Sequence, residues 1–146
     1  MEWNEYLDWT IEPAKTACEP YDLPWQVVVA QGAIESSWGN SRIGEYNIFG
    51  RKYGGYGSYI ECNTQEEDES GEWYTIVAKF QDYGSLEEAI GDWCELMNWG
   101  DYLRYTEQYH QDHDIEAFVR GIAGIYATDS SYGDKIMQTM KACELI

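Results

Sequence analysis

The middle of the chain holds a single pair of strand-like runs, Tyr56 to Cys62 and Trp73 to Phe80, between segments of helical periodicity. An acidic connection ending in Ser70-Gly71 joins the runs, which is typical of a β-hairpin. A mostly helical chain with one inserted hairpin predicts a two-lobed α+β domain, with a cleft between the lobes that could hold a polymer. Since 146 residues fit one domain, we expect residues 1–146 to form a single catalytic unit.

Before the hairpin the sequence predicts three helices. Apolar residues between positions 3 and 18 share one helical face, but Pro13 should divide this segment into two short helices. A firmer helix is expected to follow Asp22 as its N-cap, with Pro24 in the first turn, and to end at Gly39. The glycine-rich stretch 40–57 that follows is expected to be an ordered loop.

The helical pattern returns after the hairpin. Ser85-Leu86-Glu87-Glu88 forms a capping box that should begin a helix. Shorter helices are expected from about Asp101 to Tyr109, Asp114 to Tyr126, and Ser131 to Cys143.

The composition limits the possible partners. With 27 Asp and Glu against 9 Lys and Arg, the net charge is −18, which disfavours nucleic acid and anionic membranes. The 7 Trp and 13 Tyr argue against disorder and suit a groove for sugars, whose apolar faces stack on aromatic rings, although most aromatic residues of any domain belong to its core.

Cysteines and termini give few functional signals. Four widely spaced cysteines, without a Cys-x-x-Cys or Cys/His cluster, predict buried free thiols and no metal site. Residues 1–5 lack the basic and apolar regions of an export signal, and no apolar stretch could span a membrane. We therefore expect a soluble monomer.

Glu35 is the best candidate for acid chemistry. It lies near the C-terminal end of an otherwise apolar helix, where lost hydration and the negative helix end would both favour the protonated carboxyl group. Such a group could protonate the leaving oxygen of a glycosidic bond. The alternative is an ordinary solvated glutamate on a helix surface.

A second carboxylate could come from the hairpin. Because strand side chains alternate between two faces, at most one or two of its acids can face a cleft. Acidic runs of this kind are otherwise solvated turns. The candidates are Glu61, Glu66, Glu67, Asp68, Glu69 and Glu72.

Four short motifs follow one another along the chain: Ala33-Ile34-Glu35-Ser36-Ser37-Trp38-Gly39, Asn47-Ile48-Phe49-Gly50, Phe80-x-x-Tyr83-x-Ser85 and Tyr126-Ala127-Thr128-Asp129. In this order they resemble glycoside hydrolase family 73, the endo-β-N-acetylglucosaminidases of autolysins, flagellar wall hydrolases and phage lysins. The resemblance extends from about Trp25 to Met140. It implies a lysozyme-like fold, peptidoglycan glycan strands as substrate, cleavage of the β-1,4 bond after N-acetylglucosamine, and no cofactor.

The resemblance implies catalytic roles for three residues. Glu35 falls on the family's catalytic acid, and Tyr126 falls on a tyrosine near the catalytic centre, with a core tyrosine as the alternative. The family's second acid follows a threonine, which favours Glu66 in Thr64-Gln65-Glu66, whereas counting back from Gly71 favours Glu67. The substrate's own acetamido group could replace this second acid.

Four further residues are expected at the substrate. Asn47 and Phe49 belong to a motif that shapes the cleft floor in the family, so substrate contact and loop structure both remain open. Gly50 is expected to allow close backbone approach or a positive φ angle. We also expect Trp38 and Trp73 to bind substrate.

Other activities remain as alternatives. A muramidase or lytic transglycosylase would share the helix-borne glutamate and the wall substrate, while a non-catalytic wall-binding module or a phage structural component would share the fold. To act on the bacterial cell wall, the chain would need phage-type release or a longer exported protein. Without the wall-binding repeats that proteins of this kind often carry, it would be a bare catalytic domain, tethered by a partner or by further residues.

Overall fold

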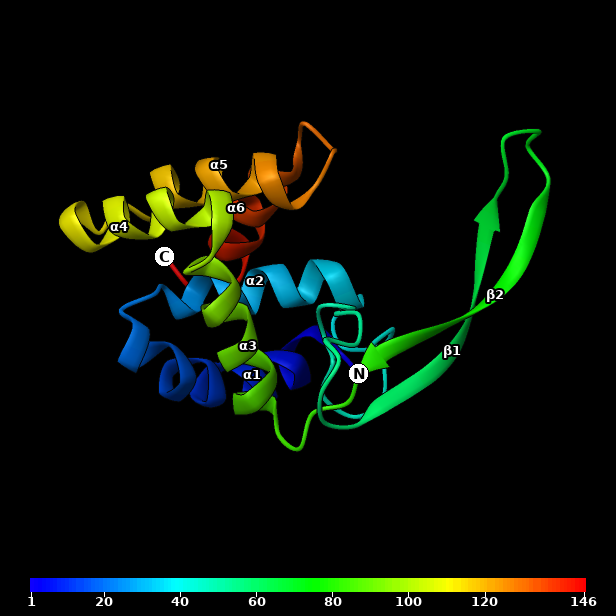
Figure 1. Cartoon of the computed structure of the whole chain (residues 1–146). Coiled ribbons are helices and arrows are strands. Elements are labelled where there is room, and N and C mark those ends of the chain that lie inside the picture. Colours follow the sequence, from blue (N-terminus) through cyan, green and yellow to red (C-terminus); the bar gives the residue numbers. More distant parts are fainter.

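The computed structural model describes all 146 residues. Figure 1 shows the helices gathered into one body, from which a two-stranded hairpin projects, so the predicted mostly helical α+β architecture is confirmed. No helix is both long and apolar enough to cross a bilayer. The elements are α1 (Trp3–Cys18), the 3-10 helix η1 (Glu19–Tyr21), α2 (Trp25–Ser36), β1 (Tyr59–Glu67), β2 (Trp73–Gln81), α3 (Leu86–Met97), the 3-10 helix η2 (Gly100–Tyr102), α4 (Leu103–Asp112), α5 (Ile115–Tyr126) and α6 (Tyr132–Ala142).

Helix α2 lies at the centre of the helical body. It packs against both α1 and α6, and all residues from Val27 to Ala33 are buried. A helix covered on several sides needs no polar stripe, which explains its nearly continuous apolar sequence. The side chain of Gln31 in α2 is fully buried and accepts a 2.9 Å hydrogen bond from Trp93 Nε1 of α3.

Two of the predicted helix starts are confirmed by their caps. Ser85 Oγ accepts a hydrogen bond from the Glu88 amide at the start of α3. Asp114 Oδ1 accepts one from the Ala117 amide, 3.0 Å away, at the start of α5. Each side chain satisfies one amide that the first helical turn leaves without a partner.

Two predictions about the N-terminal segment are wrong. Helix α1 continues through Pro13, because a proline removes only one helical hydrogen bond and buried residues on both sides of it, Thr10 and Ala14, hold the helix against the core. Asp22 is not the N-cap of α2, which begins at Trp25 with Pro24 in the cap position. Asp22 has a left-handed backbone and pairs with His113 instead.

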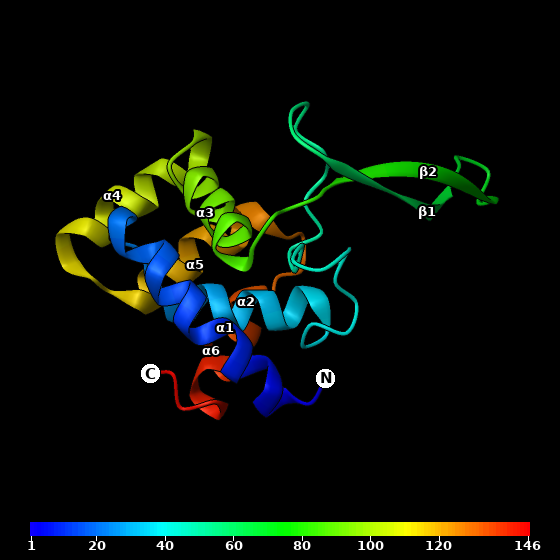
Figure 2. The ribbon, with the colours of Figure 1, turned by 90° about the horizontal axis from the view of Figure 1, so that it is seen from below.

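The hairpin is antiparallel, and its register pairs Tyr59 with Gln81 and Glu67 with Trp73. β1 begins later than predicted because Gly55 and Gly57, with φ angles of 96° and 76°, belong to the preceding loop. It also extends through part of the acidic run, where exposed carboxylates keep their hydration. Figure 2 shows the hairpin projecting away from the helices.

All four cysteines are free thiols. Cys18 of α1 and Cys94 of α3 are buried as predicted, with their Sγ atoms 3.8 Å apart. Cys62 and Cys143 are only half-buried, so the prediction of burial is wrong for these two.

Candidate active site

The C-terminal turn of α2 sets the position of Glu35. Ser36 Oγ donates a 2.6 Å hydrogen bond to the Gly32 carbonyl and accepts a 2.8 Å hydrogen bond from the Gly39 amide. The segment Ser37-Trp38-Gly39 then has φ angles of 50°, 59° and 83°, which end the helix and turn the chain. Glu35 is therefore held on a last helical turn with a well-defined end.

The Trp38 side chain packs at the margin of the core. Its half-buried ring packs edge-on against Tyr6 of α1, with the ring centroids 5.7 Å apart and the planes at 89°. This edge-to-face geometry is a favourable aromatic contact within the margin of the core. The contact supports a packing role for Trp38 and gives no support to the predicted sugar contact.

A pair of tyrosines lies next to Glu35. The Tyr132 hydroxyl donates a 2.6 Å hydrogen bond to Glu35 Oε1. The Tyr132 ring stacks on the ring of Tyr126, with centroids 5.9 Å apart and planes at 2°. Burial raises the pKa of both tyrosines and the negative charge of Glu35 adds to the shift, so both hydroxyl groups stay protonated at neutral pH.

The side chain of Glu35 is itself exposed, which differs from the expected loss of hydration on its helix. The reason is that the last turn of α2 emerges from the core, while Ser36 on the same turn is buried. A pocket of about 480 Å³ lies between the end of α5 and the start of α6. Tyr126 lines the pocket and Glu35 does not, so the stacked tyrosines are the link between the pocket and the carboxylate.

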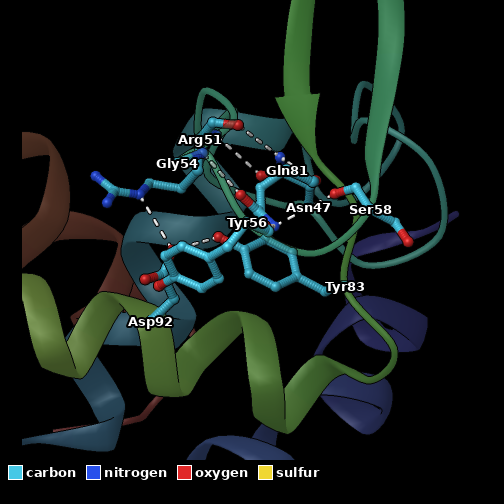
Figure 3. Close-up of polar contacts among 8 residues, drawn as sticks. All are labelled: Asn47, Arg51, Gly54, Tyr56, Ser58, Gln81, Tyr83 and Asp92. Carbon is cyan, nitrogen blue, oxygen red and sulfur yellow. Dashed lines mark hydrogen bonds and ion pairs between the residues drawn. The ribbon is translucent and has the colours of Figure 1, made fainter.

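Asn47 and Phe49 hold the loop that precedes the hairpin. Asn47 Nδ2 donates to the carbonyls of Arg51 and Gln81, and Asn47 Oδ1 accepts from the Arg51 amide, each at 3.0 Å (Figure 3). The Asn47 and Phe49 residues are only 1% and 6% exposed. Of the two roles left open by the sequence, loop structure is the one that these contacts support. Gly50 has the expected positive φ angle of 64°.

Replacing Asn47 with Ala is expected to lower the free energy of unfolding by about 3 kcal/mol. The change removes three hydrogen bonds and takes the Asn47 partner from the Arg51 amide and the Gln81 carbonyl, while the Arg51 carbonyl keeps its hydrogen bond from the Gln81 amide. Urea denaturation of the variant measures the loss. The matched control is Asn63→Ala, because Asn63 is exposed on β1, and it should change the stability by less than about 0.5 kcal/mol. Equal losses in both variants would contradict the role given to Asn47.

The predicted hairpin residues are not brought to Glu35. Glu66 and Trp73 are exposed near the outer end of the hairpin, and both views show this end apart from the helices (Figures 1 and 2). The register pairs Glu66 with Tyr74 and Glu67 with Trp73, so Glu66 and Trp73 lie on opposite faces of the ribbon. A substrate on the Glu66 face would meet Tyr74, which is 48% exposed, before it met Trp73.

Tyr132 was not found by sequence reasoning. It is separated from Glu35 by 97 positions and reaches it because α6 packs against α2. No local pattern marks such a contact. Arg51 and Asp92 were also missed, and their side chains form an ion pair with Nε and Oδ2 3.4 Å apart.

Residues 11–145 match the family model described as mannosyl-glycoprotein endo-β-N-acetylglucosaminidase, the glucosaminidase family. The chain belongs to this family. The catalytic domain of the autolysin Auto from Listeria monocytogenes has a similar structure, with a TM-score of 0.84 and 29% identity over 98% of this chain and 85% of that domain. The resemblance to glycoside hydrolase family 73 and the lysozyme-like fold that it implied are thereby confirmed.

Curated relatives of this glucosaminidase-family chain are enzymes by name. The exo-glucosaminidase LytG of Bacillus subtilis is 30% identical over 99% of this chain, and the peptidoglycan hydrolase FlgJ of Escherichia coli is 35% identical over 89%. A probable N-acetylmuramidase of Lactococcus lactis is 29% identical over 82%. The matches cover 52%, 44% and 29% of these proteins, so the chain corresponds to about half of each relative or less. The expected membership of a glycoside hydrolase family is confirmed.

Proposed function

We propose that this domain hydrolyses the glycan strands of bacterial peptidoglycan at the β-1,4 bond after N-acetylglucosamine, with Glu35 as general acid. The observation that carries the proposal is the hydrogen bond from Tyr132 to Glu35 Oε1, with the Tyr132 ring stacked on Tyr126, which lines the pocket. A carboxyl group oriented through one oxygen can present the other to the leaving-group oxygen of the substrate. The relatives named as a peptidoglycan hydrolase and an exo-glucosaminidase support wall glycan as the substrate.

Because Glu35 is exposed to water in the free domain, bound substrate would have to exclude this water. The carboxylate is exposed, while the two tyrosines beside it are largely covered. A sugar ring bound over this surface would displace water from the carboxyl group and favour its protonated form. Tyr126 and Tyr132 stay protonated, so the Tyr132 hydroxyl would keep its hydrogen bond to Glu35 and no tyrosinate charge would lie beside the reacting group.

For the second carboxylate we propose Glu66. It shares a strand face with Thr64 and with the Ile60–Phe80 pair at the base of the hairpin, whereas Glu67 lies on the opposite face. Phe80 is buried, which identifies this face as the one that turns toward the helical body at the base. Glu66 would act after the hairpin bends toward α2. In the absence of that motion, the acetamido group of the substrate would take its place.

The cleaved bond is tested by analysing the reducing ends of digested peptidoglycan. The proposal expects reducing N-acetylglucosamine. Reducing muramic acid would instead identify a muramidase, the second candidate, which the similarity to the lactococcal relative favours. Anhydro-muramic ends would identify a lytic transglycosylase, and either of these results would overturn the proposed specificity.

A further inference from the structure

A groove lies between α3 and the loop before the hairpin. It consists of two adjoining pockets of about 370 and 330 Å³ that share Arg51, Asp92 and Glu95. Two of the most exposed aromatic residues of the chain line it, since Tyr56 is 76% and Trp99 is 74% exposed. Open aromatic rings beside charged groups are typical of a binding surface and not of a core.

The carboxylates in this groove already have hydrogen-bond donors. Asp92 Oδ2 accepts from the Tyr83 hydroxyl and from Arg51 Nε. Glu88 Oε2 accepts from the Gly84 amide at 2.9 Å, and Glu95 Oε1 accepts from the Tyr21 hydroxyl. These acids therefore have part of their accepting capacity filled from within the protein.

The two cationic side chains of the groove, Arg51 and Lys52, use few of their hydrogen-bond donors within the protein. Arg51 uses only Nε for Asp92, and its two terminal nitrogens make no hydrogen bond. Lys52 Nζ lies 4.4 Å from the centre of the Phe80 ring and has no carboxylate partner. Figure 3 shows the Arg51 side chain extending away from Asn47 and Gln81, so its terminal nitrogens lie at a free end. The groove thus has unused donors for an anion.

Arg51 is also held rigidly for this purpose. Its amide and carbonyl both bond to Asn47, and its carbonyl also accepts from the Gln81 amide at 3.0 Å. The Asp92 carboxylate then fixes the direction of the guanidinium group. A guanidinium fork fixed in this way can bind a carboxylate through two parallel hydrogen bonds with little further loss of conformational entropy.

We propose that this groove binds the peptide stem of peptidoglycan, with a stem carboxylate held by Arg51 and Lys52. The inference rests on the proposed function, since it names a second part of the same substrate. The stem carries free carboxylates whereas N-acetylglucosamine is uncharged, and in a chain of net charge −18 only local cations can hold an anion.

The test compares two polymers that differ only in charge. One is peptidoglycan with intact stem carboxylates, and the other is the same material with those carboxylates converted to amides. The unaltered domain should cleave the carboxylated polymer about ten-fold faster at low substrate concentration. Arg51→Gln and Lys52→Gln should each reduce this preference, and Lys52→Gln does so without touching the Arg51–Asp92 pair. Lys141→Gln, which removes one exposed charge outside the groove, should keep the preference.

Binding of both polymers to the Glu35→Gln variant, measured by co-sedimentation, reads the same preference without cleavage. Equal binding and equal cleavage of the two polymers would overturn the inference. An Arg51→Gln variant that loses activity equally on both polymers would show a merely structural arginine, which overturns it as well. Absence of cleavage with a retained binding preference would instead sink the proposed function and leave the groove assignment standing.

Discussion

Replacing Glu35 with Gln is expected to lower the rate of peptidoglycan hydrolysis by about 10³-fold. The amide keeps the size of the side chain but cannot deliver a proton to the leaving oxygen. Since Glu35 is exposed and makes a single protein hydrogen bond, the free energy of unfolding should change by less than about 1 kcal/mol. Clearing of a suspension of purified walls measures the rate, and co-sedimentation with the walls should show retained binding.

Glu107→Gln provides the matched control for the loss of one negative charge. Glu107 is exposed on α4 and makes no hydrogen bond or ion pair through its side chain, so this variant should hydrolyse walls at the original rate. If the Glu35 variant cleared walls as fast as the Glu107 variant, Glu35 could not be the general acid, and the assignment of the active site would fail.

Replacing Trp93 with Ala should lower the free energy of unfolding by about 4 kcal/mol. Trp93 is 1% exposed and packs edge-on against Phe118, with ring centroids 6.4 Å apart. The truncation leaves a cavity between α3 and α5 and removes the hydrogen bond from Trp93 Nε1 to the buried Gln31 side chain. Urea denaturation, followed by circular dichroism, gives the difference in stability.

Trp99→Ala removes the same side chain from an exposed position six residues further along the chain. Because Trp99 is 74% exposed, its loss should change the stability by less than about 0.5 kcal/mol. A Trp93 variant as stable as the Trp99 variant would show that the contact between α3 and the rest of the core contributes little to folding.

The helices with local end signals were predictable from the sequence. Ser85 and Asp114 cap their helices through side chains a few residues from the amides that they bind, so the signal lies within one short segment. The predictions made from Pro13 and Asp22 were wrong because their outcome depends on contacts between distant segments. The continuation of α1 depends on its packing against α2 and α3, and the backbone of Asp22 is set with a contact to His113, distant in sequence. Tertiary contacts override local preferences in both places.

The candidate site also contains residues that short motifs identify and residues that only the tertiary structure places there. Glu35 and Tyr126 could be named because each belongs to a short motif, whereas Tyr132 and Arg51 gain their roles from contacts between distant segments. Asn47 lies in a motif too, but burial and three backbone contacts give it a task that the motif alone did not reveal. The catalytic role of Glu66 stays a prediction.

The hairpin is anchored to the helical body at its base, where Asn47 donates a hydrogen bond to the Gln81 carbonyl at the end of β2. A strand of nine residues is about 30 Å long, so a tilt of about 5° at the base would displace the tip of the hairpin by about 2.5 Å. Misplacing a reacting group by about 1 Å can cost about 10²-fold in rate. Mutations around the Asn47–Gln81 hydrogen bond should therefore change a reaction rate that depends on the hairpin tip more strongly than their distance from the tip suggests.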